Sequence, residues 1–109
     1  MGDTIFGRII RREIDADIVY EDDRVLAFKD IFPKAPIHYL VIPKQPIATL
    51  NDATVAEQEL LGHMLLTAAK LARQAGIAES GYQVKMHCNA DGGQEIYHIH
   101  LHLLGGCKL

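Results

Sequence analysis

The segment EIYHIHLHLLGG, residues 95–106, constrains the fold most because it places three histidines at alternate positions. The histidines are His98, His100 and His102, and isoleucine or leucine follows each of them. Successive side chains of a β-strand point to opposite faces of a sheet. The spacing therefore predicts a strand over residues 96–104, with an apolar face on the core and a row of imidazoles lining a cleft.

Two kinds of chemistry suit such a row, and a third interpretation is that the histidines are ordinary polar residues on an exposed sheet face. Three neutral imidazoles could bind zinc and leave the fourth coordination position open for water, but no carboxylate that would orient the imidazoles is obvious nearby. Alternatively, one imidazole attacks phosphorus while its neighbours donate protons to the phosphoryl oxygens and the leaving group. A pKa of about 6.5 for free histidine allows neutral and charged rings to coexist near neutrality. We favour phosphorus chemistry and expect no metal.

A glycine-rich turn, NADGGQE, directly precedes the histidines. Gly92 and Gly93 can adopt backbone angles that are closed to other residues, which lets their N–H groups approach an anion. The turn thus supports a phosphate ligand beside the imidazoles.

Patterns elsewhere in the chain predict a short helix and four more strands. Asp3 or Thr4 can cap a helix with one apolar side, formed by Ile5, Phe6, Ile9 and Ile10. The polar stretch at residues 21–24 suits a hairpin turn, and Pro33 and Pro36 indicate an extended loop. The predicted strands, with the histidine strand, cover residues 17–20, 25–30, 38–44, 81–89 and 96–104.

A long helix is predicted over residues 54–76. Thr54 and Glu57 form a capping box, and Gly76 supplies the stop. His63 is expected at the surface or the edge of the packed face, not as a ligand. The predicted core stripe consists of Leu61, Met64, Leu65, Ala68, Leu71, Ala72 and Ala75.

Composition limits the class of protein. The 109 residues, 49% of them hydrophobic, suit a single α+β domain over residues 1–109 with a mostly antiparallel sheet. The formal charge of −3 gives no basic footprint for nucleic acid. No long apolar run or signal peptide is evident, and Cys88 and Cys107 are expected to be free, so we expect a cytoplasmic protein that does not bind membranes.

The residues resemble a known family over almost the whole chain. The segment HIHLHLL matches the alternating signature of the histidine triad (HIT) superfamily, and DTIFGRIIRREI, YEDDRVLAFKDI, LVIPK and DGGQEIYHIHLHLLGG match in the same order. The chain is most similar to the Hint branch, nucleotide-binding proteins that act as purine nucleoside phosphoramidases. This resemblance implies a HIT-like fold with a five-stranded sheet, one long helix and one short helix.

The resemblance also implies a catalytic role for each of four histidines. His100 would attack the α-phosphorus of an adenosine or guanosine 5′-phosphoramidate and form a nucleotidyl-histidine that water hydrolyses. His102 would contact the phosphate, and His98 and His38 would complete the polar set. No cofactor is implied.

Further residues would bind the nucleotide if the resemblance holds. Asp30 would hold the ribose hydroxyls, while Gly93, Gln94 and Glu95 would approach the phosphate. Family members are homodimers in which the two sheets join into one of ten strands, and the long helix would pack across the two-fold axis. The base pocket would be lined by Ile5, Phe6, Ile9, Phe28, Ile31 and Leu40.

Three positions depart from the family pattern. His87 stands where asparagine is usual in the nucleotide site, so either His87 replaces the amide as a donor, which we favour, or Asn89 reaches in. Phe32 replaces the serine of a common DISP motif and would narrow the pocket entrance or alter the loop. The chain ends at Leu109, whereas relatives carry a longer tail that reaches the partner's site.

Two other functions stay open beside phosphoramidate hydrolysis. One is a regulatory module that binds nucleotides and has little catalysis. The other is a dinucleoside polyphosphate hydrolase of the same superfamily. His102 argues against the nucleotide-transferase branch, which commonly has glutamine there. The physiological substrate and its leaving amine are not determined by the sequence.

Overall fold

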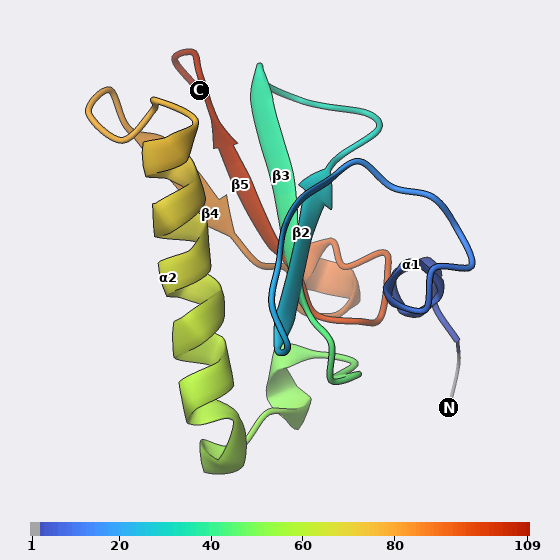
Figure 1. The fold of residues 1–109 in the computed structure, drawn as a ribbon. Helices are drawn as coiled ribbons and strands as arrows, with labels where there is room; N and C mark the ends of the chain where they lie inside the picture. Colours follow the sequence, from blue (N-terminus) through green and yellow to red (C-terminus); the bar gives the residue numbers. More distant parts are fainter. Residues whose placement is uncertain (1–2) are drawn as a thin grey trace.

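A five-stranded antiparallel sheet divides the molecule into two layers (Figure 1). The structure is a computed structural model that describes residues 3–109. The α+β class and the five-stranded sheet are confirmed. In spatial order the strands are β1 (Ile18–Glu21), β2 (Val25–Lys29), β3 (Ile37–Pro43), β5 (Leu101–Gly105) and β4 (Tyr82–Lys85).

The hairpin between β1 and β2 forms where the polar stretch predicted it. The Asp22 carboxylate accepts the backbone N–H groups of Arg24 and Val25 at 2.8 Å, which fixes the tight turn. The same carboxylate also accepts the hydroxyl of Tyr20 and meets His63 Nε2 at 2.7 Å, so His63 lies at the edge of the packed face, as expected.

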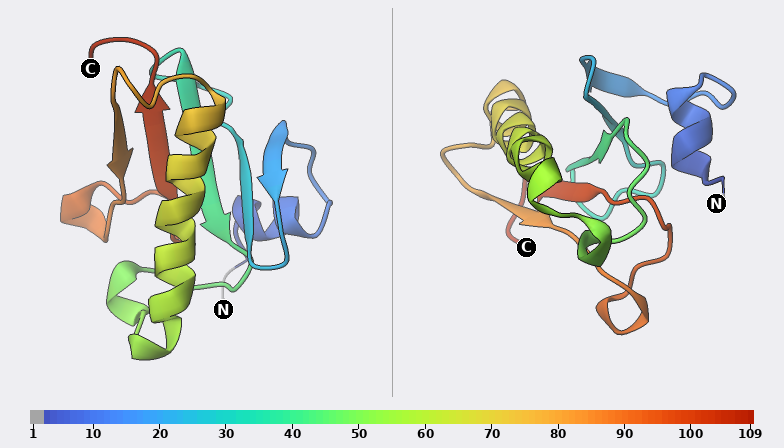
Figure 2. Two further views of the ribbon diagram at one scale, coloured as in Figure 1. Left: turned by 60° about the vertical axis from the view of Figure 1, so that its left-hand side comes forward. Right: turned by 90° about the horizontal axis from the view of Figure 1, so that it is seen from below.

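One face of the sheet is covered by α2 (Gln58–Gln74), as Figure 2 shows. The predicted start at Thr54 is wrong, because the capping box of Thr54 and Glu57 closes a 3₁₀ turn at Val55–Glu57 and the α-helix follows it. The predicted stop is confirmed, since Gly76 has a φ of +77° that favours glycine.

The predicted core stripe of α2 is correct except at one edge. Leu65 is 52% exposed, whereas Leu60 and Thr67 are buried beside Met64. The reason is the 100° step of the helix, which turns Leu65 away from the sheet when Met64 points directly at it. The core on this face also takes Ile99, Leu101 and Leu103, so the apolar side of the histidine segment packs under α2, as predicted.

The opposite face of the sheet carries α1 (Ile5–Ile10), which Figure 2 shows across the sheet from α2. Thr4 caps this helix, because its hydroxyl accepts the N–H of Gly7. Phe6 and Ile9 are buried and pack on a second apolar cluster formed by Leu26, Phe28, Leu40 and Ile42. Both faces of the sheet are thus partly covered, and the histidine side lies under α1.

Two strands are shorter than predicted. β4 ends at Lys85 instead of reaching residue 89, and β5 begins at Leu101 instead of residue 96. Pro43 ends the neighbouring strand β3 and has no N–H to continue the ladder. Residues 96–100 instead bond individually, with the Ile99 N–H donating to the Ile47 carbonyl at 2.8 Å.

The two-layer packing predicts different costs for truncating two leucines. Leu103→Ala, at a fully buried position under α2, should lower the free energy of unfolding by about 2–5 kcal/mol. Leu50→Ala, at a position that is 44% exposed, should cost less than about 1 kcal/mol. Chemical denaturation monitored by circular dichroism measures both, and equal costs would contradict the assigned core.

Candidate active site

A row of side chains on the α1 face of the sheet forms the floor of a cavity. His102 on β5 lies opposite Leu40 on β3, and Leu40 lies opposite Phe28 on β2. Directly opposed residues of antiparallel strands project to the same face. The cavity has a volume of about 560 Å³. Of the sequence-predicted residues it is lined by Ile5, Phe6, Ile9, Phe28, Asp30, Ile31, His38, Leu40, His87, Glu95 and His102.

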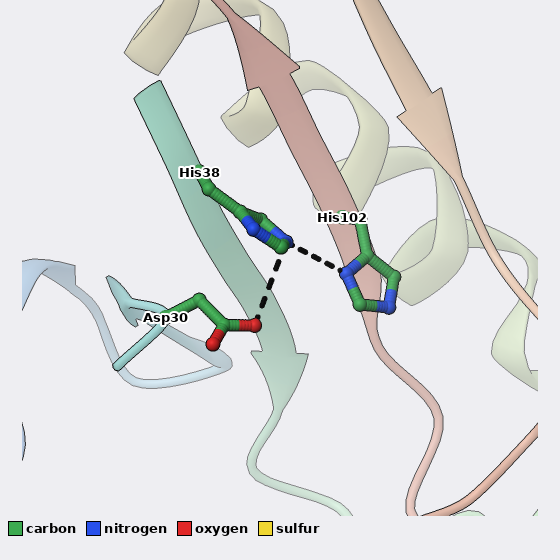
Figure 3. Close-up of side chains that lie close together, drawn as sticks. All are labelled: Asp30, His38 and His102. Carbon is green, nitrogen blue, oxygen red and sulfur yellow. Dashed lines mark hydrogen bonds and ion pairs between the residues drawn. The ribbon is translucent and has the colours of Figure 1, made fainter. Parts of the chain in front are cut away.

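Asp30, His38 and His102 converge at one end of this cavity, although they come from three separate segments (Figure 3). His38 Nε2 lies 3.0 Å from His102 Nδ1 and 3.5 Å from Asp30 Oδ2. The other nitrogen of His38, Nδ1, accepts the backbone N–H of Lys34 at 3.1 Å. Asp30 is held in turn, because its Oδ1 accepts the backbone N–H of Phe32.

These contacts fix the tautomers of two histidines. A backbone N–H is always a donor, so His38 Nδ1 must be the acceptor nitrogen and Nε2 carries the proton. That N–H points to His102 Nδ1, which therefore accepts. A neutral His102 consequently carries its proton on Nε2 and is a donor on the side away from His38.

His100 has the opposite tautomer. Its Nδ1 lies 2.8 Å from the backbone carbonyl of His98, which can only accept. The lone pair is then on Nε2, which has no hydrogen-bond partner among residues 3–109 and is not sealed from solvent. The ring packs between Phe6, 5.0 Å away by centroids, and His102, 5.1 Å away. His100 therefore holds a nitrogen lone pair in a fixed orientation, on a residue that is 7% exposed and whose ring packs against Phe6 and His102, two residues that line the cavity.

The large cavity is lined by His102 but not by His100 or His98, so the predicted row of three imidazoles facing one cleft is wrong for two of the three rings. The His98 ring lies on the same side of the sheet, against Phe6, but its Nε2 donates to the Pro43 carbonyl at 2.7 Å. The ring borders a separate cavity of about 300 Å³ near α1. Because β5 begins only at Leu101, His98 lies outside the ladder and its side chain turns away from the large cavity. The backbone carbonyl of His98 orients the His100 ring.

Burial keeps the imidazoles neutral. It is the largest cause that lowers the pKa of His38, His98 and His100 below the ordinary value. The pKa of His102 falls to about 4, through burial first and then through the neighbouring imidazoles His100 and His38. A neutral ring is the form that has a lone pair, so the environment favours nucleophilic nitrogen at neutral pH.

His87, the residue that departs from the family pattern, lines the same cavity. Its Nδ1 donates to the Gly92 carbonyl at 2.7 Å, and its ring centroid lies 5.4 Å from that of His102. Gly93 has a φ of +82°, and an added Cβ there would lie 3.7 Å from His87 Nδ1. The turn thus holds the His87 ring through Nδ1, and Nε2 has no hydrogen-bond partner within the described residues 3–109.

The predicted phosphate contacts from the glycine-rich turn stay predictions. The N–H groups of Gly93 and Gln94 donate to carbonyls inside the turn, those of Ala90 and Asn89. The side chain of Gln94 is buried and bonds to backbone groups of Asn89, Ala48 and Ile96. A phosphate at these groups would have to replace internal hydrogen bonds.

Asp30, His38 and His102 are also the group of side chains that come close enough to hold a cation. The donor set fits poorly, because a metal-ligating histidine donates its other ring N–H to an acceptor. Nδ1 of His38 accepts the Lys34 N–H, so the proton of the ring is on Nε2. His38 Nε2 therefore has no lone pair for a metal. The geometry suits a hydrogen-bonded pair better than a metal site.

Sequence reasoning did not single out several groups that build the site. The Lys34 N–H and the Pro43 carbonyl act through the backbone, and they have no side-chain signature. Ile14, Ala16 and Ile96 pack on the apolar cluster beside the cavity. The available signal was the sequence PKAPIH, in which two prolines indicate the loop that carries Lys34 next to His38.

The hydrogen bonds predict a specific pattern of tautomers that NMR can read. At neutral pH, His100 should be the Nδ1–H tautomer, whereas His38, His98 and His102 should be Nε2–H tautomers. Long-range ¹H–¹⁵N correlation spectra of ¹⁵N-labelled protein distinguish the two forms. An Nε2–H form of His100 would contradict the assigned nucleophile.

Comparison with known proteins identifies the family. A family model described as HIT domain matches residues 11–109. The purine nucleoside phosphoramidase of Escherichia coli strain K12 is 58% identical over 107 residues, which cover 98% of this chain and 90% of that protein. An uncharacterized HIT-like protein of Synechococcus elongatus is 61% identical over 107 residues, with coverage of 98% and 93%.

Solved structures share the fold. A HIT family hydrolase from Legionella pneumophila superposes with a TM-score of 0.95 at 50% identity, covering 97% of this chain and 95% of that one. A histidine triad protein from Clostridium difficile gives a TM-score of 0.95 at 43% identity, covering 100% and 95%. With a family model spanning most of its length and relatives this similar, the chain belongs to the HIT domain family.

Proposed function

We propose that the protein is a purine nucleoside phosphoramidase that hydrolyses the P–N bond of adenosine or guanosine 5′-phosphoramidates. The observation that carries the proposal is the Nε2 lone pair of His100, oriented by the Nδ1–H bond to the His98 carbonyl, on a ring that packs against two residues lining the cavity, Phe6 and His102. The 58% identity to the phosphoramidase of E. coli supports it over almost the whole chain.

The nucleotide has one favourable orientation in the cavity. A purine suits the apolar end, where Phe6 and Phe28 meet edge to face with centroids 5.6 Å apart. The Asp30 carboxylate lines the same cavity 3.5 Å from His38, and it can accept the ribose hydroxyls. The α-phosphate then lies at His102, whose Nε2–H donates to a phosphoryl oxygen.

The first step forms a covalent intermediate. His100 Nε2 attacks the α-phosphorus, the P–N bond breaks, and its electrons go to the amine nitrogen, which needs a proton. The His38–His102 pair is unsuited to supply this proton. If Nδ1 of His102 were also protonated, its N–H would face the Nε2–H of His38, and two donors would repel each other. His87 takes and gives a proton at Nε2 without losing its bond to Gly92, so we assign the donor role to His87.

The second step releases the nucleotide. Water attacks the nucleotidyl-histidine, gives its proton back to His87 Nε2, and the bond from phosphorus to His100 breaks. No metal takes part in either step. In this scheme His38 positions His102, and His98 positions His100 through its carbonyl.

Replacement of the nucleophile tests the function. His100→Gly should lower turnover of adenosine 5′-phosphoramidate by about 10³-fold or more while AMP binding stays measurable by calorimetry, because the covalent route is lost and the base pocket is kept. His63→Ala is the matched control, since His63 bonds Asp22 at the edge of α2, away from the cavity. Full turnover by His100→Gly would contradict the mechanism.

We also propose a cytoplasmic homodimer. Among the described residues, no helix is both long and apolar enough for a membrane span. β4 is an edge strand, and Leu65 and Leu66 of α2 are exposed in the single chain, so a second copy can extend the sheet and cover both leucines. A single species of 12.1 kDa in sedimentation equilibrium would contradict the dimer.

A further inference from the structure

The row of side chains across the cavity floor extends beyond the histidines to a lysine. Lys85 on β4 lies opposite His102 on β5, and the row continues through Leu40 to Phe28. Opposed residues of antiparallel strands project to the same face, so the floor changes from apolar at β2 to cationic at β4. If the base lies over Phe28 and the phosphate at His102, the β4 end is left for the leaving group.

A second lysine borders the same end of the cavity. Lys34 lines the cavity with Lys85, next to His38, to which its backbone N–H donates. Both ammonium groups are close enough to His38 to lower the pKa of that residue further, after the larger effect of burial. Two positive charges therefore lie around the phosphate end of the cavity.

Neither lysine is neutralised by a carboxylate partner. Within residues 3–109, Lys34 and Lys85 form no ion pair within 4.0 Å. Two other lysines do, since Lys44 meets Glu21 at 2.7 Å, and Lys29, which also lines the cavity, meets Asp17 at 3.6 Å. Two unpaired cations on a chain of net charge −3 are available for an anionic ligand.

Three carboxylates also line the cavity, those of Asp15, Asp30 and Glu95. Asp30 lies at the histidine end, where its carboxylate is engaged by His38 and the Phe32 N–H. Within residues 3–109, none of the three forms an ion pair with Lys34 or Lys85. The two ammonium groups are therefore not neutralised by the acidic residues of the cavity.

We propose that Lys34 and Lys85 form a subsite for an anionic group on the leaving amine. The protein then prefers phosphoramidates whose amine carries a carboxylate or a phosphate, and it discriminates against cationic amines. The proposal rests on the phosphoramidase function, because it concerns the group released from phosphorus. The chemistry is charge attraction by two flexible ammonium groups, which accept either kind of anion.

Matched substrates test the subsite. Adenosine 5′-phosphoramidates of 3-aminopropanoate, 3-aminopropanamide and 1,3-diaminopropane differ in leaving-group charge at similar size, and that of 2-aminoethyl phosphate distinguishes phosphate from carboxylate. We expect kcat/KM to be highest for the anionic amines and lowest for the cationic amine. Added salt should reduce the difference, because the lysines are exposed.

Variants separate recognition by the lysines from the intrinsic reactivity of each amine. Lys34→Gln keeps the backbone N–H that holds His38, and Lys85→Gln removes the charge but keeps a polar side chain that is one atom shorter. Each should lower the ratio of kcat/KM for the anionic over the neutral substrate by about threefold, the size typical of exposed charge pairs. Lys70→Gln is the control, since Lys70 lies on α2 over Tyr20 on the other face, and it should leave the ratio unchanged.

The outcomes distinguish this proposal from the function on which it rests. Turnover of all substrates with ratios that do not change in Lys34→Gln and Lys85→Gln overturns the subsite and leaves the phosphoramidase intact. Turnover of none of the substrates overturns both. A fall in the ratio for only one of the two anionic amines restricts the subsite to that anion and supports it.

Discussion

The site depends on hydrogen bonds that decide which nitrogen of each imidazole carries a proton. The backbone N–H of Lys34 makes His38 a donor toward His102, and the backbone carbonyl of His98 leaves a lone pair on His100 Nε2. Both controlling groups belong to the main chain, so their roles as donor and acceptor cannot change with pH. Burial under α1 then keeps the rings neutral, and the pKa of His102 falls to about 4. The two tautomers suit the roles that we propose for these neighbouring histidines, His100 as the nucleophile and His102 as the donor to the phosphate.

The sheet makes this arrangement possible because one of its faces packs on the core under α2 and the other forms the floor of the cavity. Ile99, Leu101 and Leu103 lie under α2 and anchor the histidine segment from behind. On the α1 face, Phe6 packs against both His100 and Phe28, so one aromatic side chain joins the proposed nucleophile to the proposed base pocket. The stability of the core and the geometry of the site are therefore coupled through the same segment.

Much of the fold follows from patterns that the sequence displays openly. Alternation predicted which residues of 98–103 face α2, and the polar run around Asp22 predicted the first hairpin. The late start of β5 at Leu101 was not predictable in this way, because it depends on Pro43 in the neighbouring strand β3. Pro43 precedes His98 by 55 residues in the sequence. The exposure of Leu65 likewise depends on how α2 is rotated about its axis against the sheet. The apolar periodicity of α2 does not decide which residue at the edge of its apolar stripe is buried.

The site was predictable in its residues more than in its geometry. The family resemblance named His38 and Asp30, and the structure brings both to His102. It did not indicate that His98 borders a different cavity, since that follows from the early break in the ladder. The consequence of His87 also becomes apparent only in three dimensions, where its bond to Gly92 leaves Nε2 as the nitrogen that can exchange a proton.

The most direct test of this account is to locate the covalent bond. After rapid quenching of the reaction with adenosine 5′-phosphoramidate, peptide mass spectrometry and ³¹P NMR should find an adenylyl group on His100, attached at Nε2. An adenylyl group on another residue, or on Nδ1 of His100, would contradict the tautomers on which the mechanism depends.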